Sequence, residues 1–191
     1  MPEARARLWL VRHGETDWNR EGRYQGQSDI PLNATGLAQA RALLPTFAGM
    51  PIAAIYSSDL QRAATTAELL GEALNLPVSR QRGLREARLG RWEGMLFSDI
   101  QVVYAAEWAE RRRDPLNARP PGGESLLEVA ARGAAAADEM ARRHAGQQVI
   151  VVSHGLLVAA LLCRGRGLPL AEAFNHIPAN CSAELVEWAA G

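Results

Sequence analysis

The sequence Leu8-Trp9-Leu10-Val11-Arg12-His13-Gly14 is a short apolar run that stops on an arginine and a histidine. Two later runs follow the same plan: residues 149–152 lead into Ser153-His154-Gly155, and residues 52–56 lead into a polar segment that ends at Arg62. In open α/β sheets, ligands bind at the carboxyl ends of the strands. We therefore expect two imidazoles and two guanidiniums to meet at one crevice.

Segments with helical periodicity separate these runs. Apolar residues recur at helical spacing after Asn33, a residue suited to an N-cap, and again after Ser58. Ser125 and Glu128 form a capping-box pattern that opens an alanine-rich helix ending near His144. Because parallel strands need crossover helices, this order predicts an α/β fold, a three-layer sandwich whose mostly parallel sheet carries helices on both faces.

Residues 89–122 interrupt the alternation. They hold one amphipathic stretch around residues 100–108, then three arginines at 111–113, then a loop rich in proline and glycine. We interpret the segment as a small helical cap over the C-terminal strand ends, the alternative being an ordinary peripheral helix. The three arginines are expected to form a solvated helix face, the alternative being that they recruit acidic substrates. We thus predict a single domain over residues 1–191 with a cap insertion at about 89–122.

Length and composition indicate a globular protein. A chain of 191 residues suits one core that buries roughly 70% of the surface of the unfolded chain. A formal net charge of zero offers no field that would attract nucleic acid or an anionic membrane. The apolar run 8–11 is far shorter than a signal peptide or a spanning helix, so we expect a cytoplasmic protein. Cys163 and Cys181 are expected to be buried free thiols, and oligomeric state is not indicated.

The basic and histidine residues exclude several chemistries. All 21 basic residues are arginine, so a Walker-type phosphate loop and a Schiff base both lack their lysine. The four histidines show no spacing typical of a metal site, and we expect no metal and no cofactor. His144, near a helix C-terminus, complements the helix dipole, and His176 gives no functional signal.

The strand-end residues suit a phosphomonoester. Such a dianion needs hydrogen-bond donors and positive charge that are already in place. Arg12 and Arg62 can each hold two phosphate oxygens with a planar guanidinium. Arg62 lies in the first turn of its predicted helix, where a cation opposes the dipole unless an anion lies nearby. Gly155 begins a helix after His154, so its amide can face the same anion.

The two histidines can then take different roles. His13 is a candidate nucleophile because two neighbouring guanidiniums would lower its pKa and keep the imidazole neutral. Its other ring nitrogen is expected to donate to a backbone carbonyl. His154 is a candidate donor to the phosphoryl oxygens. The leaving oxygen needs a proton, for which Glu86 is a candidate, although spacing equally allows Glu93 or Glu15.

Arg12-His13-Gly14-Glu15-Thr16 resembles the signature of the histidine phosphatase superfamily, the phosphoglycerate mutase-like proteins. Further blocks resemble those of the family, in the same order, at residues 56–63, 66–68, 84–86, 90–94, 122–125 and 152–155. Any one block is weak, but together they are highly specific and span almost the whole chain.

The resemblance implies a set of roles. It implies that His13 becomes a phosphohistidine, that Arg12, Arg62 and His154 clamp the phosphoryl group, and that Glu86 is the proton donor. It also implies that Asn19, Gln25, Gly26 and the Gly155 amide line the phosphate pocket, without a metal.

The family contains hydrolases and mutases. Residues 23–32 are similar to the phosphatase branch, the stretch between Glu86 and His154 is short, and little chain follows Trp188. These features favour a phosphoric monoester hydrolase that acts on small phosphomonoesters. A cofactor-dependent phosphoglycerate mutase is the alternative, and a binding module without turnover is the least favoured.

Substrate identity is open at this point. The aromatic residues Trp92, Phe97, Tyr104 and Trp108 form either an apolar wall for an aromatic or nucleoside phosphate or the core between cap and sheet. Sugar phosphates, phosphoglycerates and α-ribazole phosphate all fit the sequence.

Overall fold

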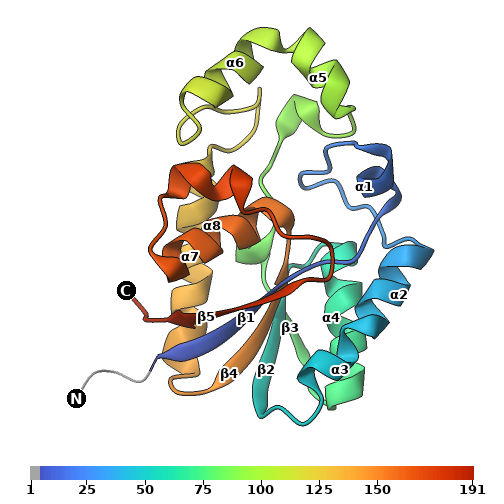
Figure 1. Cartoon of the computed structure of the whole chain (residues 1–191), viewed down its shortest axis with the longest axis vertical. Coiled ribbons are helices and arrows are strands. Elements are labelled where there is room, and N and C mark those ends of the chain that lie inside the picture. The colour runs from blue at the N-terminus through green and yellow to red at the C-terminus, as the bar shows by residue number, and fades with distance from the viewer. Residues whose placement is uncertain (1–4) are drawn as a thin grey trace.

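A five-stranded sheet organises the computed structural model, which describes residues 5–191 (Figure 1). The strand order is β3-β2-β4-β1-β5, with every neighbouring pair parallel except β1 and β5. The strands are β1 (Ala6–Arg12), β2 (Ile52–Ser57), β3 (Val78–Arg80), β4 (Gln148–Ser153) and β5 (Ala183–Trp188). The prediction of an α/β fold with a mostly parallel sheet is confirmed.

Helices cover both faces of the sheet (Figure 1). The α-helices are α1 (Asp17–Glu21), α2 (Ala34–Ala42), α3 (Leu44–Phe47), α4 (Gln61–Leu74), α5 (Phe97–Val103), α6 (Ala105–Arg113), α7 (Leu126–Arg143) and α8 (Gly155–Arg166). Three short 3-10 helices are η1 (Arg82–Leu84), η2 (Gly90–Trp92) and η3 (Leu170–Asn175). Helices α2, α3 and α4 pack on one face, and α7 and α8 pack on the other.

The central strands supply apolar side chains to both layers. Leu8 and Leu10 of β1 belong to the core under α7 and α8, whereas Val11 belongs to the core under α2 to α4. Strand β4 divides its valines and isoleucine in the same alternating way. This two-residue period is that of an extended strand buried on both sides, which explains the continuous apolar runs in the sequence.

The local helix signals work as expected. The Asn33 side chain accepts a hydrogen bond of 2.8 Å from the Gly36 amide at the start of α2. The capping box of Ser125 and Glu128 opens α7, and His144 is its C-cap. The apolar stripe after Asn33 is divided between α2 and α3, because Pro45 has no N–H to continue the first helix.

Two strands were missed by the sequence analysis. Strand β3 has only three residues, too few to show a period. Strand β5 is an antiparallel edge strand in which only Val186 and Trp188 are buried, so its polar positions hide the strand signal. Cys163 is buried and Cys181 is half-buried, and both are free.

The segment 89–122 lies over the carboxyl ends of the strands, at the top of Figure 1. It holds the 3-10 helix η2 and two α-helices, α5 and α6, where one amphipathic helix was predicted, because Tyr104 leaves the helical conformation at φ −119° and ψ 43°. The indole of Trp92 is fully buried beneath them, with ring centroids 5.9 Å from Trp108 and 6.4 Å from Tyr104.

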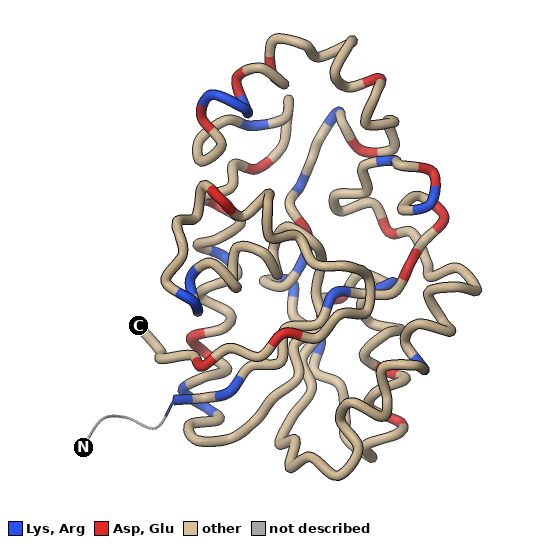
Figure 2. Tube along the Cα trace, viewed as in Figure 1, with Lys and Arg blue, Asp and Glu red and all other residues tan. Residues whose placement is uncertain are grey.

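Charged residues of both signs are distributed over the described chain. Along residues 5–191, acidic and basic residues are interspersed over both the sheet layers and the cap (Figure 2). In the same part of the chain, no helix combines the length and the apolar character that crossing a lipid bilayer requires.

Gly36 allows α2 to approach the loop after β1, and we predict that this position tolerates no side chain. A Cβ atom there would lie 2.1 Å from the Glu15 carbonyl oxygen, so the loop would have to move. Gly36→Ala is expected to lower the free energy of unfolding by about 1–3 kcal/mol in urea titrations. Thr35→Ala, an exposed change in the same helix, is the control. Equal stability of the two variants would contradict this expectation.

Candidate active site

Two histidines follow neighbouring parallel strands and face each other. Strands β1 and β4 pair with Arg12 opposite Ser153, so His13 and His154 leave the sheet side by side. Their ring centroids are 5.2 Å apart, and 3% and 0% of the two residues are exposed. His13 Nδ1 donates to the Gly14 carbonyl oxygen at 2.6 Å, which leaves Nε2 with its lone pair.

Two arginines border the histidines. Arg62, fully buried in the first turn of α4, donates from Nη1 to the Ser28 carbonyl and from Nη2 to the Gly26 carbonyl, each at 2.7 Å. Arg12 donates from Nη1 to the Pro178 carbonyl at 2.7 Å. These bonds hold both guanidiniums in place without neutralising their charge.

Several buried nitrogens around this point have no hydrogen-bond partner among residues 5–191. They are the Nε atoms of Arg12 and Arg62 and both ring nitrogens of His154. Buried polar groups are nearly always paired, and an unpaired cluster calls for an explanation. Guanidinium and imidazole donors converging in one place are the groups that bind a phosphate or a similar oxyanion.

Burial and positive charge set the protonation of the histidines. The pKa of His13 lies well below its ordinary value because of burial first, then Arg62, then Arg12. The pKa of His154 is also well below the ordinary value, with burial the largest cause and Arg62 the next. Burial lowers the pKa of Arg62 to about 10, while Glu86 opposes the change. At neutral pH the site therefore combines neutral imidazoles with charged guanidiniums.

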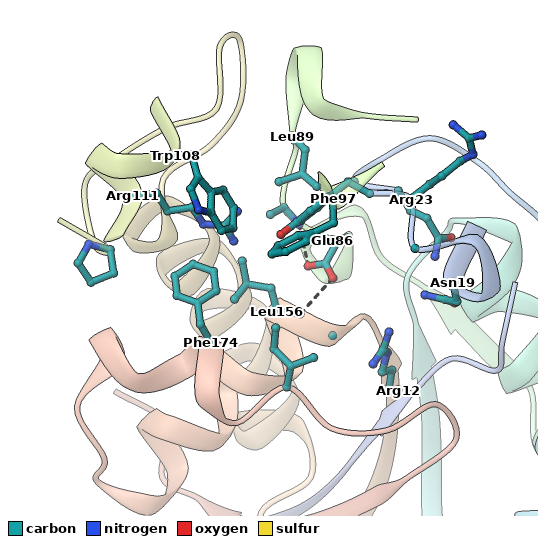
Figure 3. Close-up of a pocket in the computed structure, with 18 of the residues that line it drawn as sticks. Arg12, Asn19, Arg23, Glu86, Leu89, Phe97, Trp108, Arg111, Leu156 and Phe174 are labelled. Carbon is teal, nitrogen blue, oxygen red and sulfur yellow. Dashed lines mark hydrogen bonds between the residues drawn. The ribbon is translucent and has the colours of Figure 1, made fainter. Parts of the chain in front are cut away.

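Of the three carboxylates left open by the sequence, Glu86 is the one that lines the cavity. Its carboxylate accepts a hydrogen bond of 3.0 Å from the Leu156 amide at the start of α8 (Figure 3), and one of 3.3 Å from the next amide, that of Leu157. Glu93 accepts from loop amides and from a serine hydroxyl, and Glu15 accepts from Asn33, so both support loops.

The other predicted binding residues line the same cavity: Asn19, Gln25, Gly26 and Gly155. Asn19 is held in the capping box of α1, and the Oε1 atom of Gln25 is buried without a partner in the described chain. Gly26 has a positive φ of 52°, which aims its carbonyl at Arg62. Gly155 is the first residue of α8, where helix amides carry partial positive charge.

The cavity extends from His13 to the cap and measures about 680 Å³, and His154 lies buried behind its lining residues. Its outer wall is largely apolar (Figure 3). Phe97 and Trp108 come from the cap, Leu156 comes from α8, and Phe174 comes from η3. The predicted aromatic set is thus divided, since Trp92 belongs to the core beneath the cap while Phe97 and Trp108 face the cavity.

Arg111 corrects the expectation of a solvated arginine face. Its guanidinium carbon lies 4.3 Å from the ring centroid of Phe174 and 5.5 Å from that of Trp108, and its Nη1 is buried without a partner within residues 5–191. Arg112 and Arg113 are exposed as predicted. The signal available in the sequence was the spacing, because Arg111 follows Trp108 by three residues and so shares its helix face.

Across residues 5–191, no group of three histidine, cysteine, aspartate or glutamate side chains is arranged to hold a metal ion.

Known proteins resemble this chain along nearly its full length. The profile of the histidine phosphatase superfamily (branch 1) matches residues 8–191. Phosphoserine phosphatase 1 of Hydrogenobacter thermophilus is 34% identical over 94% of this chain and 85% of its own. A probable phosphoglycerate mutase, GpmB, of Yersinia pestis is 35% identical over 95% of this chain and 84% of its own. The structure of a mycobacterial glucosyl-3-phosphoglycerate phosphatase with VO3 superposes with a TM-score of 0.85, at 34% identity, covering 94% of this chain and 90% of that one.

The buried neutral histidines predict a stability that falls in acid. Because the folded-state pKa of His154 lies below that of the unfolded chain, unfolding takes up a proton once the pH is below about 6.5. Each such histidine then costs up to about 1.4 kcal/mol of stability per pH unit, down to its folded-state pKa. Urea unfolding at several pH values from neutral to acid is expected to show a shallower slope for His154→Asn than for the parent. An unchanged slope in His154→Asn would contradict the assignment.

Proposed function

The chain belongs to the histidine phosphatase superfamily, and from this membership we propose that it hydrolyses small phosphomonoesters with His13 as the residue that accepts the phosphoryl group. The observation that carries the proposal is the neutral, oriented imidazole of His13 beside the unpartnered donors of Arg12, Arg62 and His154. Phosphatase names among the relatives and structural neighbours support the same reaction type.

In the first step the phosphoryl group passes from substrate to enzyme. His13 Nε2 uses its lone pair to attack phosphorus, and the bond from phosphorus to the ester oxygen breaks. Arg12, Arg62 and His154 stabilise the charge on the phosphoryl oxygens. Glu86 gives its proton to the departing oxygen, so the product leaves as a neutral alcohol and Glu86 becomes a carboxylate.

The second step restores the enzyme. The Glu86 carboxylate takes a proton from a water molecule, whose oxygen forms a bond to phosphorus while the bond between phosphorus and His13 Nε2 breaks. Inorganic phosphate is released, and both side chains return to their starting states. Glu86 therefore serves as acid and then as base, a double use that suits its place on the cavity wall.

The outer cavity suggests the kind of leaving group. We assign residues 89–122 as the cap of a single domain, and their apolar wall accommodates carbon-rich groups, whereas Arg111 Nη1 offers a buried donor. Two similar proteins are named as phosphatases of phosphoserine and of glucosyl-3-phosphoglycerate, and both of these compounds carry a carboxylate as well as the phosphate. A phosphomonoester whose leaving group bears a carboxylate would satisfy both ends of this cavity.

A phosphoglycerate mutase is the second candidate, because the chain is also similar to a probable enzyme of that kind. Both reactions share the first step and differ in what attacks the phosphohistidine. Hydrolysis predicts release of inorganic phosphate from 3-phosphoglycerate, whereas a mutase predicts isomerisation that depends on a bisphosphorylated activator with little release.

The phosphohistidine proposal is tested by His13→Ala. The parent is expected to release phosphate from p-nitrophenyl phosphate in EDTA and to carry acid-labile, base-stable label on His13 after rapid quench. His13→Ala is expected to lose both, because the neighbouring imidazole, that of His154, does not line the cavity and has no carbonyl accepting from its Nδ1 in the described chain. His176→Gln should keep both. An active parent without label would rule out the covalent route.

The role of Arg111 is tested by Arg111→Met. Removing the guanidinium is expected to lower kcat/KM for 3-phosphoglycerate about tenfold to a hundredfold, the range for a lost hydrogen bond to a charged group. For p-nitrophenyl phosphate, which has no carboxylate, the change should be less than about threefold. Arg113→Met, on the exposed side of the same helix, is the control. Equal losses on the two substrates would exclude Arg111 as a carboxylate-binding residue.

A further inference from the structure

A short segment of irregular chain carries Glu86, and side chains hold it in place. The 3-10 helix η1 ends at Leu84, and the residues that follow belong to no strand or α-helix. The carbonyl oxygens of four consecutive residues, 83–86, all accept hydrogen bonds from side chains. Outside a helix or sheet, no regular backbone hydrogen bonds fix the orientation of these carbonyl groups. The side-chain donors fix it instead.

One residue, Arg132 of α7, supplies most of these donors. Its Nη1 donates to the Gly83 carbonyl at 2.9 Å and to the Arg85 carbonyl at 2.7 Å, and its Nη2 donates to the Glu86 carbonyl at 3.3 Å. Ser153 Oγ holds the remaining carbonyl, that of Leu84, at 2.7 Å. The guanidinium of Arg132 therefore binds carbonyl groups both before Glu86, at Gly83 and Arg85, and at Glu86 itself.

Glu124 holds Arg132 in turn. Its carboxylate accepts from Arg132 Nε at 3.2 Å and Nη2 at 3.0 Å, a two-point contact. The same carboxylate accepts from the Arg88 amide at 2.8 Å, and the Glu124 amide donates to the Arg88 carbonyl at 2.8 Å. Residues on either side of Glu86 are thus joined to one ion pair, whose side chains are 23% and 16% exposed.

We propose that Arg132, oriented by Glu124, is a positioning residue that sets the place of the Glu86 carboxyl group relative to the leaving oxygen. The proposal rests on the function proposed above, in which Glu86 donates the proton. Arg132 does not line the cavity, and its contacts with the segment that carries Glu86 are made to the backbone carbonyls of residues 83, 85 and 86. A displacement of about 1 Å in a catalytic group can cost a hundredfold in rate.

A charge-only role does not explain this arrangement. A positive charge needs no particular orientation, whereas Arg132 uses every nitrogen of its planar fork, two on carbonyls and two on Glu124 with Nη2 shared. A lysine could not reproduce this set, because its donors radiate from one nitrogen atom. The structure therefore favours a geometric function.

The test uses leaving groups that differ in their need for a proton. p-Nitrophenyl phosphate releases a stable anion, whereas benzyl phosphate of similar size must be protonated as it leaves. Arg132→Met is expected to lower kcat/KM for benzyl phosphate about tenfold to a hundredfold and to change that for p-nitrophenyl phosphate less than about threefold. A purely structural defect would lower both equally and would overturn the proposal.

Glu86→Gln and the double variant complete the experiment. Glu86→Gln should show the same dependence on leaving group, and adding Arg132→Met should cause little further loss on benzyl phosphate, since both changes act through one group. Additive losses would overturn the positioning role. If Glu86→Gln itself shows no such dependence, the proton-donor assignment fails, which separates that failure from the failure of the Arg132 proposal.

Controls address folding. Arg119→Met breaks another ion pair at the start of α7, with Glu128, and has no contact with residues 83–86, so both substrates should react as with the parent. Melting temperatures are measured for every variant. If Arg132→Met cannot be purified folded, Arg132→Lys takes its place and is expected to show a smaller loss with the same preference for p-nitrophenyl phosphate. Equal loss on both substrates in that variant would equally overturn the proposal.

Discussion

The parallel pairing of β1 with β4 is the constraint on which the site depends. Its register sets Arg12 opposite Ser153, and the His13 amide continues the ladder by donating to the Ser153 carbonyl at 3.0 Å. The backbone pairing alone therefore places the two residues that follow, His13 and His154, side by side. A shift of one residue in this register would turn the buried valines of β4 to the opposite face, so core packing and site geometry share one requirement.

Burial then decides what the adjacent groups can do. The Arg62 guanidinium is fully buried, yet its terminal nitrogens are satisfied by the carbonyls of Gly26 and Ser28, which keeps it charged and fixed. The same burial, with that charge, keeps His13 neutral. Charged donors beside a neutral imidazole are the arrangement that the proposed phosphoryl transfer to His13 needs. The cap adds apolar wall residues and also Arg111, whose guanidinium packs against Phe174 at the outer end of the cavity.

Much of this could be predicted because local rules are strong at strand ends and helix starts. The cap of α2 at Asn33, the capping box of α7 and the first-turn place of Arg62 all follow from short patterns. Strand β5 could not be predicted from the sequence, because an edge strand with one solvent-exposed face lacks a continuous apolar run. Arg111 was predicted wrongly for a related reason. A run of three arginines indicates a solvent-exposed helix face unless the residues that pack against that helix are known, and here Phe174 packs against Arg111.

By itself, the sequence determined the α/β class, the three strand-end segments and the chemical character of the groups they carry, because these depend on periodicity and residue type. Residue spacing left three candidate carboxylates and the family resemblance pointed to Glu86, but only the tertiary structure shows that Glu86, unlike Glu15 and Glu93, lines the cavity. It also divided the aromatic residues between core and wall, and it placed Arg132 on the carbonyls that lead into Glu86. Those contacts join residues as much as 49 positions apart, and no local pattern encodes them.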